Sequence, residues 1–439
     1  MNKIKLWYFY LLIVSVFTSY TYVKAQEAVN QLSPGEKKAG WILLFDGVNK
    51  TTEWKVGESG DATSNDWDIE DSSMKSPNHQ YSESMLFTKK TFDNFEWKAD
   101  WKLNKGGNSG LFIRVPVKTG WFCGSYEFAI LDDSSGGDRN EFSGNPGETG
   151  IPIKLTGAVY DIYPATQDGK TIAMGGKWIE AAKPYDQWNR GVIFANGNSI
   201  EHWVNGQKVV DFEIGSKDYE ARYLNSKFNR SCEDSVYAKS KTGFLGIQDH
   251  GKGLITWVRN LKVRPFTSGE KLNSPLITPN GGNFSGATKV VLDAAITGAS
   301  VHYTLDGSDP TESSPTYVDT LILKSPLTLK TRTYRPKFQP SDISSATFSI
   351  GGGGLGIANG MAISNSNLRI LNLKQQLRFY NQNGSSFTGT LISLEGKVVF
   401  TFTTQNKIRD IDISHLKRGI YQLKINQLSS TFSQRIFLP

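Results

Sequence analysis

Short runs in which apolar and polar residues alternate fill most of the chain between residues 40 and 266. An alternation with a period of two is typical of half-buried β-strands. Asn196-Gly197-Asn198 and Asn205-Gly206 separate such runs as hairpin turns do. The clearest runs are FEWKADWKL (95–103), SGLFIRVPV (109–117), GSYEFAIL (124–131), TGAVYDIY (156–163) and ITWVRNLKV (255–263). So many short strands in one segment predict an all-β sandwich or jelly roll.

The composition changes after this segment. Every tryptophan except Trp7 lies between Trp41 and Trp257, which places a domain boundary near residue 266. The segment 40–266 is therefore predicted to be the first folded domain.

Two smaller β-patterned regions follow. Residues 275–350 contain VHYTLDGSDP, a strand that runs into an Asp-Gly turn, and later LTLKTRTYRP. Residues 351–366 begin with four glycines and predict a flexible linker. Residues 367–439 alternate again. We therefore expect two small β-sandwich modules, 275–350 and 367–439, after the jelly roll.

The N-terminus has the pattern of a secretory signal peptide. Lys3 and Lys5 precede an apolar run from Leu6 to Phe17, and a small-residue cleavage pattern ends at Ala25. We predict that residues 1–25 are removed and that 26–39 form an N-terminal linker. The apolar run is short for a membrane span, and no other segment is apolar enough, so no transmembrane segment is expected after signal removal.

The net charge of +7 does not describe the whole chain evenly. The segment 361–439 contains ten Lys and Arg residues and three acidic residues, and the signal peptide is also basic. The remainder is slightly acidic. A nucleic-acid partner is therefore not expected, because such a partner requires a basic surface on the functional domain.

The residues that could carry metal or redox chemistry are few. Cys123 and Cys232 can form a disulfide in an exported protein, but their separation in sequence leaves this open. Asp132, Asp133 and Asp138 supply oxygen ligands of the kind that calcium uses, without a recognisable binding-loop spacing. A solvated acidic loop is the preferred interpretation and a structural calcium is the alternative, so no cofactor is predicted.

The segment 40–266 resembles the 3-keto-disaccharide hydrolase family. The resemblance is carried by GWILLFDG, GGNSGLFIRV, YEFAILDD, TGAVYDIY, EHWVNGQKVVDF and GFLGIQDHGKGLITWVRNLKV, in that order. It implies a concanavalin-like jelly roll with a sugar site on its concave face. It also implies a carbohydrate substrate, a glycoside oxidised to a ketone at C3, which is cleaved by hydrolysis or by elimination of the aglycone.

Both C-terminal modules also resemble known families. Residues 275–350 are similar to the chitobiase/β-hexosaminidase C-terminal module, through YTLDGSDPT and LKTRTYRP. Residues 367–439 are similar to the type IX secretion C-terminal sorting domain, through GKVV, IDISHLKRGIYQLKI and RIF. The second resemblance implies export by type IX secretion machinery through the outer membrane of a Gram-negative bacterium, to a secreted or cell-surface-attached form.

Cleavage of a 3-keto-glycoside needs a base, an acid and hydrogen-bond donors. The C3 ketone acidifies the hydrogen on C2, so a base can remove it and an acid can assist the departure of the C1 substituent. Glu127 and His250 are the predicted catalytic residues. In GFLGIQDHG, strand alternation places Gln248 and His250 on one face, with Asp249 available to orient His250.

Further residues are candidates for substrate binding. In GLFIRV, alternation places Arg114 and Phe112 on one face; Arg114 is a candidate sugar ligand, and an ion pair with Glu127 is the alternative. Trp121 is the preferred stacking platform. For His202, in a hairpin, packing is the alternative role. The substrate-binding candidates are Arg114, Asn108, Gln248, Asp249, Tyr160, Asp161, Trp121 and His202.

Two other functions are compatible with the same pattern. The family strand usually reads Glu-x-Gln, whereas this chain has Ala129 two residues after Glu127, so a non-catalytic carbohydrate-binding jelly roll is the alternative function. An ordinary glycosidase of the laminarinase kind needs two carboxylates at displacement distance, supplied by Glu-x-Asp-x-x-Glu. Residues 127–132 read EFAILD and lack the middle acid, which disfavours this class.

Overall fold

The computed structural model of this chain describes residues 28–438 with several gaps. The segments outside the description are 1–27, 51, 57–66, 78–83, 117–122, 136–142, 146–147, 171–174, 233–239, 285, 351–361, 365–367, 374–375, 382–384, 394–395, 418, 428–429 and 439. The predicted signal peptide, Trp121 and Asp138 lie in these segments.

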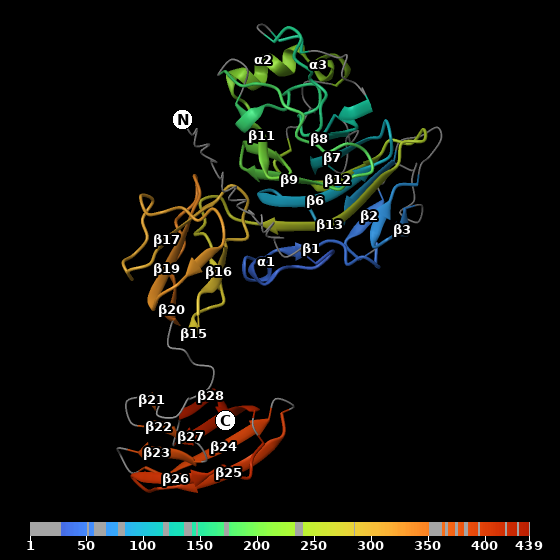
Figure 1. The fold of residues 1–439 in the computed structure, drawn as a ribbon. Coiled ribbons are helices and arrows are strands. Elements are labelled where there is room, and N and C mark those ends of the chain that lie inside the picture. Colours follow the sequence, from blue (N-terminus) through green and yellow to red (C-terminus); the bar gives the residue numbers. More distant parts are fainter. Residues whose placement is uncertain are drawn as a thin grey trace, which may run out of the picture. The chain divides into compact units, whose positions relative to one another are not determined.

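The segment Trp41–Arg264 belongs to one compact unit built on two antiparallel sheets. Figure 1 shows the strands of both sheets in this unit. The larger sheet contains, in spatial order, β11 (Gln207–Glu213), β10 (Ser199–Val204), β9 (Asn189–Asn196), β6 (Phe95–Leu103), β13 (Thr256–Pro265), β4 (Ser73–Lys75) and β3 (Asp68–Glu70), and β1 (Ile42–Leu43) also pairs with β13. The smaller sheet contains β2 (Trp54–Val56), β5 (Ser84–Thr88), β12 (Phe244–Asp249), β7 (Asn108–Val115) and β8 (Tyr126–Leu131).

The apolar faces of the two sheets form one core. Alternate residues of the smaller sheet, such as Leu111, Phe128 and Ile247, pack with Trp97 and Trp101 of the larger sheet. Burying one such side chain contributes roughly 1.5–3 kcal/mol, so the period-two pattern fixes which face of each strand points inward. The predicted jelly-roll sandwich is confirmed.

Two short helices and a disulfide complete this unit. Helix α2 (Lys217–Asn225) begins at Ser216, whose side chain accepts a hydrogen bond from the Tyr219 amide, and α3 (Lys227–Ser231) follows it. Cys232, just after α3, is bonded to Cys123, just before β8. The bridge closes a loop of 109 residues, for which chain-entropy models give roughly 4–5 kcal/mol of stabilisation.

The C-terminal part of the chain contains two further pairs of small sheets, each with its own apolar core. The first pair consists of β14 (Leu276–Thr278), β16 (Thr288–Asp293) and β18 (Leu321–Leu323), and of β15 (Gly282–Phe284), β20 (Ser344–Ile350), β19 (Leu327–Tyr334) and β17 (Ser300–Thr304). The second pair consists of β21 (Ala362–Ser364), β22 (Leu368–Leu373), β23 (Gln376–Asn381) and β26 (Ile408–Asp412), and of β25 (Val398–Thr404), β24 (Phe387–Ser393), β27 (Gly419–Gln427) and β28 (Ser430–Leu438).

The described part of the expected N-terminal linker is ordered by contacts. The Asn30 side chain donates to the Ser72 carbonyl, and its carbonyl oxygen accepts from the Asn260 amide. Residues Pro34–Lys38 form the short helix α1, where the Lys38 amine donates to the Ser274 carbonyl. Within the described part of the chain, no helix has both the length and the hydropathy needed to span a membrane.

Candidate functional site

The smaller sheet of the jelly roll has a second face, turned away from the core. Phe112, Phe244 and Met85 form a separate apolar cluster on this face. Residues paired across antiparallel strands point to the same side. Glu127 pairs with Phe112, and Gln248 pairs with Met85, so both polar side chains lie on this outer face.

Gly110 occupies a central position on the outer face. The register places Gly110 opposite Ala129 of β8 and Ile247 opposite Leu111, so that Gln248 follows beside Gly110. The Ser109 hydroxyl donates to the Gln248 carbonyl at 2.8 Å, in keeping with this register. Gly110 therefore lies between two strands whose outward residues are Gln248 and Ala129.

Gly110 is necessary for the position of Glu127. A Cβ atom at Gly110 would lie 2.8 Å from Glu127 Oε1 and 2.9 Å from its Cγ, as well as 2.8 Å from the Phe112 ring. The half-buried Glu127 side chain thus lies directly over the glycine. Any side chain at position 110 must displace the carboxylate, because real Cβ atoms do not approach other atoms so closely.

The sheet spacing relates Glu127 to His250. Adjacent strands lie about 4.8 Å apart, and alternate residues of one strand lie about 6.8 Å apart. Glu127 and His250 are separated by two strand spacings and by four residues along the strand direction, so their Cα atoms lie roughly 16 Å apart. Gly110 lies at the midpoint of that diagonal, and Asn108, opposite Leu131, continues the same outer face. From one end of this diagonal the Glu127 side chain reaches inward and lies over Gly110.

The end of β12 explains why polar residues follow an apolar strand. Asp249 is fully buried, and its Oδ1 accepts a hydrogen bond from the Gly251 amide at 3.2 Å. Gly251 has φ +67°, in the left-handed region that glycine adopts without strain. Asp249 therefore closes the turn after the strand, while half-buried His250 leaves the sheet beside the outer face.

Arg114 does not lie where simple alternation predicts. The register between β12 and β7 shifts between Phe244 and Gly246, and Val115 packs with Phe112 in the outer apolar cluster. Alternation placed Arg114 on the same face as Phe112, and this prediction is wrong. Arg114 has φ +54° and is 2% exposed, and its guanidinium donates twice to the Asp93 carbonyl. Burial lowers the pKa of Arg114. This side chain stabilises a bulge and a neighbouring loop.

His202 is a core residue, contrary to its place among the sugar-binding candidates. Its ring is fully buried between the sheets, 4.8 Å from the Phe128 ring centroid, and its Nδ1 is 2.9 Å from the Gly157 carbonyl oxygen. Burial lowers the pKa of His202 to about 4. The packing alternative is the correct one, because Ile200 and Val204 on the same face of β10 also enter the core.

Tyr160 extends the outer face beyond the edge strand. Its amide donates to the Glu127 carbonyl at 3.1 Å, so its segment runs along the free edge of β8. Its ring packs on the apolar cluster of Ala129, Leu131 and Ala158. Ala129 is fully buried in this cluster, so the position where the family usually has glutamine is covered and is not an open part of the face.

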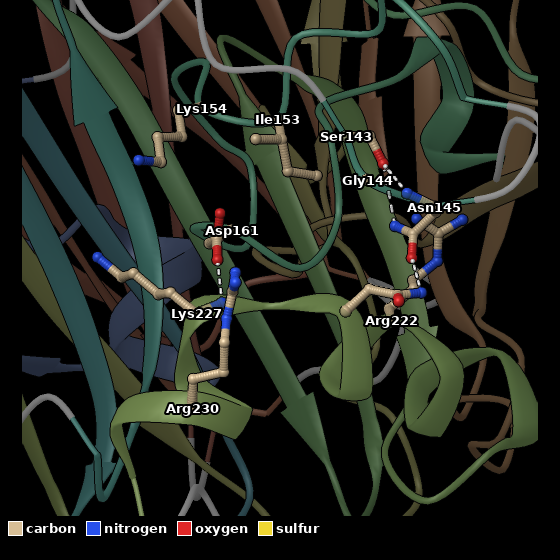
Figure 2. A pocket seen from close by; sticks show the side chains of 10 residues that line it. Ser143, Gly144, Asn145, Ile153, Lys154, Asp161, Arg222, Lys227 and Arg230 are labelled. Atoms are coloured by element: carbon tan, nitrogen blue, oxygen red, sulfur yellow. Dashed lines mark hydrogen bonds between the residues drawn. The ribbon is translucent and has the colours of Figure 1, made fainter.

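A cavity of about 260 Å³ lies beside Tyr160. Lys154 and Lys227 border it and hold their amines 4.8 and 4.3 Å from the centre of the Tyr160 ring. Asp161, with φ +62°, accepts a hydrogen bond from the Lys227 amide at 2.6 Å and caps the start of α3. Figure 2 shows Lys154, Lys227 and Arg230 gathered around Asp161. Of the sequence candidates, Asp161 lines this cavity.

The rest of the cavity wall was not found by sequence reasoning. Arg222 of α2 makes a buried bidentate pair with Glu148, at 2.6 and 3.1 Å, and also contacts Asp218 at 3.1 Å. Ser143 donates to the same Glu148 carboxylate at 2.5 Å. This network ties the 143–151 loop to α2. Its members are far apart in sequence and carry no motif, so no local signal could reveal them.

Asp132 and Asp133 of the acidic loop are not solvated, which corrects the preferred interpretation for these two residues. Asp132 and Asp133 are 3% and 6% exposed. Asp132 accepts hydrogen bonds from the Gly106 amide and from Ser134, and Asp133 accepts from the Thr156 amide. They shape turns. No cluster of three or more potential metal-ligating His, Cys, Asp or Glu residues occurs in the part of the chain that the structure describes.

The two packed antiparallel sheets define an all-β protein of the jelly-roll class. The chain belongs to the family of 3-keto-alpha-glucoside-1,2-lyase-like domains, whose model matches residues 40–264. Residues 279–345 match the chitobiase/beta-hexosaminidase C-terminal domain, and residues 368–438 match a secretion system C-terminal sorting domain. The three resemblances expected from the sequence are confirmed. The sorting domain supports export.

Known relatives each cover about half of the chain. A 3-keto-disaccharide hydrolase of Bacteroides thetaiotaomicron is 26% identical over 250 residues, which are 51% of this chain and 78% of that protein. The crystal structure of a candidate glycosyl hydrolase from Parabacteroides distasonis is 28% identical and covers 54% of this chain and 99% of its own, with a TM-score of 0.41. The carbohydrate-binding module CBM66 of Bacillus subtilis is 13% identical and covers 48% and 95%, with a TM-score of 0.27.

Proposed function

We propose that this chain is an exported enzyme that cleaves 3-keto-glycosides, with its active site on the outer face of the smaller sheet. The observation that carries the proposal is the Glu127 carboxylate held over Gly110, with Gln248 on the strand β12 and His250 just after the end of that strand. Family membership and the name of the Bacteroides relative support the choice of substrate.

The proposed reaction begins with a proton transfer from carbon. The Glu127 carboxylate removes the proton from C2, and the electron pair of that bond moves to the C3 oxygen as an enolate. In this proposal the side-chain amides of Gln248 and Asn108 donate to oxygens of the ring and stabilise the developing charge. Only a substrate with a carbonyl group at C3 can react in this way.

The second step breaks the glycosidic bond. The enolate electron pair re-forms the C3 carbonyl and a C1–C2 double bond, while the bond from C1 to the aglycone oxygen breaks. Protonated His250 gives its proton to that oxygen, so the aglycone leaves as an alcohol. Addition of water across the double bond then completes a net hydrolysis, and release before this addition is an elimination.

Export is part of the proposal. The chain carries a sorting-domain match at residues 368–438, and its first residues read as a signal peptide. Type IX machinery would carry the protein across the outer membrane, and the jelly roll would act on glycosides outside the cell, in a secreted or surface-attached form.

Aglycone release tests the function directly. The chain without its signal peptide is incubated with 3-keto-glucosides of several aglycones and with their unoxidised parents, and release is followed by chromatography. Release from the keto forms alone supports the proposal. Release from the parents at a similar rate indicates an ordinary glycosidase and overturns it.

A second candidate function is carbohydrate binding without catalysis. The observation that favours it is Ala129, which lacks the amide that the family usually places on this face and is fully buried by Ala158 and Tyr160. Saturable binding of 3-keto-glucosides in calorimetry, with no release from any substrate, would establish this candidate in place of the enzyme.

A further inference from the structure

The larger sheet also has an outer face, which lies on the opposite side of the sandwich from the proposed catalytic face. On β6, Trp101 enters the core, so the next residue, Lys102, points outward. On β13, Val258 enters the core, so its neighbours Trp257 and Arg259 point outward. This outer face therefore carries both aromatic and cationic side chains.

Five of these side chains form one cation–indole cluster. Trp257 of β13 pairs with Lys75 of β4, and the Lys102 amine lies 4.6 Å from the centre of the Trp257 ring. Trp188 directly precedes β9, whose first residue pairs with the residue before Lys102. The Lys102 amine is 5.6 Å from the centre of the Trp188 ring, and the Arg259 guanidinium carbon is 3.8 Å from it. The row from Lys75 to Trp188 crosses three strand spacings, or roughly 14 Å.

Two acidic neighbours of this cluster are already paired with cations. Glu70 accepts from the Lys75 amine at 2.7 Å. Asp100 accepts from the Arg190 guanidinium at 2.7 Å. Asp100 attracts the charge of Arg259 while Arg190 repels it, so this ion pair adds little net field at Arg259. The two carboxylates thus offset Lys75 and Arg190 and leave the other cations of the cluster.

Lys102 and Arg259 have no acidic partner in the part of the chain that the structure describes. Neither side chain forms an ion pair or a hydrogen bond there, and both contact the Trp188 ring. Their charged groups lie 5.6 and 3.8 Å from the centre of that ring, so the two groups are at most 9.4 Å apart. Both side chains are half-buried, which leaves part of each for a ligand to contact.

The chemistry of the cluster suits a carboxylate-bearing polymer. A guanidinium stacked on an indole keeps its planar fork in one orientation, ready for two parallel hydrogen bonds to a carboxylate. The Lys102 ammonium adds a point charge for a second carboxylate, and the two indoles add apolar surface of the kind that sugar rings contact. A lipid surface would instead require apolar side chains that insert between the lipids, whereas these indoles are stacked against cations.

We propose that the cation–indole cluster binds an acidic polysaccharide through the carboxylates of neighbouring uronate sugars. Arg259 holds one carboxylate and Lys102 holds another. The cluster would keep the jelly roll on an acidic glycan while the opposite sheet remains free for its own substrate. This binding goes beyond the proposed function and does not depend on it, since the two faces belong to different sheets.

Calorimetry with two forms of one oligosaccharide tests the proposal. The probes are a galacturonate oligosaccharide and the same compound with its carboxyl groups methyl-esterified, added to the chain without its signal peptide. We expect the acidic form to bind about tenfold more tightly, and the difference to shrink in high salt. Equal affinity for the two forms overturns the proposal.

Two matched double variants locate the binding. The basic segment 361–439 can also attract acidic polymers, so the effect of the variants is decisive. Lys102→Gln with Arg259→Gln removes the two unpaired cations, and Lys170→Gln with Lys217→Gln removes two exposed cations outside the cluster. The first should lower the affinity for the acidic form about tenfold, and the second should leave it unchanged. Equal affinities of the two double variants contradict the proposal.

Single variants keep the test decisive if the first double variant does not fold. Arg259→Gln should weaken binding of the acidic form more than Lys102→Gln does, because only a guanidinium donates two parallel hydrogen bonds to one carboxylate. Unchanged affinity in both single variants overturns the proposal.

Two further measurements exclude other sites and partners. Glu127→Gln alters only the opposite sheet and should bind the acidic form as the unaltered chain does; a loss there would place the ligand on the catalytic face and contradict the proposal. Vesicles of phosphatidylglycerol should bind the first double variant and the unaltered chain equally. A loss of vesicle binding in that variant, without a loss of oligosaccharide binding, would assign the cluster to a lipid surface instead.

Discussion

The two faces of the smaller sheet are built from the same strands but differ in what they do. The inner residues of β7, Leu111 and Ile113, are fully buried in the core. The outer residues of the same strand include Gly110 and Phe112, with the Glu127 carboxylate leaning over the glycine. The inner face is continuous apolar surface, whereas the outer face interrupts apolar surface with a glycine, a carboxylate and an amide.

The difference gives single residues of this sheet different roles, because some stabilise the fold and others are proposed to take part in the chemistry. An inner residue contributes through the apolar area that it removes from water. An outer residue such as Glu127 buries less of its surface and contributes through its position. Inner and outer residues of this sheet should therefore respond to mutation in opposite ways.

The largest expected effect is the loss of turnover in Glu127→Gln. The amide keeps the size of the side chain but cannot accept the C2 proton, so kcat/KM for a 3-keto-glucoside should fall by about 10²- to 10⁴-fold. The urea midpoint should stay close to that of the unaltered chain. Full activity in this variant would assign proton removal to another residue.

An inner-face substitution should show the reverse pattern. Leu111→Ala leaves a cavity in the core and should lower the free energy of unfolding by roughly 2–5 kcal/mol. Turnover per folded molecule at low temperature should remain unchanged. Urea denaturation and kcat measured on the same sample check both parts, and a loss of kcat comparable to that of Glu127→Gln would break the distinction between the faces.

His202, also in the core, should make stability depend on pH. Its folded-state pKa is about 4, below the ordinary value of 6.5, so the unfolded chain binds more protons between these values. Its contribution is fully present above pH 6.5 and is lost as pH falls toward 4, by roughly 3 kcal/mol. The free energy of unfolding, measured by denaturation at several pH values, should change less between pH 6.5 and pH 4 in His202→Gln than in the unaltered chain. Identical pH profiles for the two proteins would contradict the assignment.

The smallest expected effect comes from Gly110→Ala. The added methyl group must displace the Glu127 carboxylate or the Phe112 ring, which should reduce kcat/KM by about tenfold because the base is misplaced. A shift of the buried Phe112 ring should also lower the free energy of unfolding, by roughly 1–3 kcal/mol. Unchanged kinetics would show that the position of Glu127 over the glycine is not required.

Local patterns were enough to predict the fold. Period-two alternation identified the strands and gave the face of Gln248, while the roles of the site residues stay predictions. The same rule failed for Arg114, because a bulge in β7 is not visible in alternation. Alternation also could not decide whether His202 packs in the core or binds a sugar, because core histidines and site histidines follow the same spacing.

Other features of the site depend on contacts between distant parts of the chain. The role of Gly110 appears only when the Glu127 side chain is placed above it. The pairing of Arg222 with Glu148 joins residues 74 positions apart, and the disulfide spans 109. Asp132 and Asp133 looked like a solvated acidic loop because their backbone partners, such as Gly106 and Thr156, cannot be read from local sequence.

The most direct test of the central claim is the rate of aglycone release from a 3-keto-glucoside that carries deuterium at C2, measured in single-turnover experiments beside the undeuterated compound. We expect slower release from the deuterated substrate, because the bond from C2 to hydrogen breaks at Glu127 before or as the aglycone leaves. Equal rates, together with release from the unoxidised parent glucoside, would contradict it.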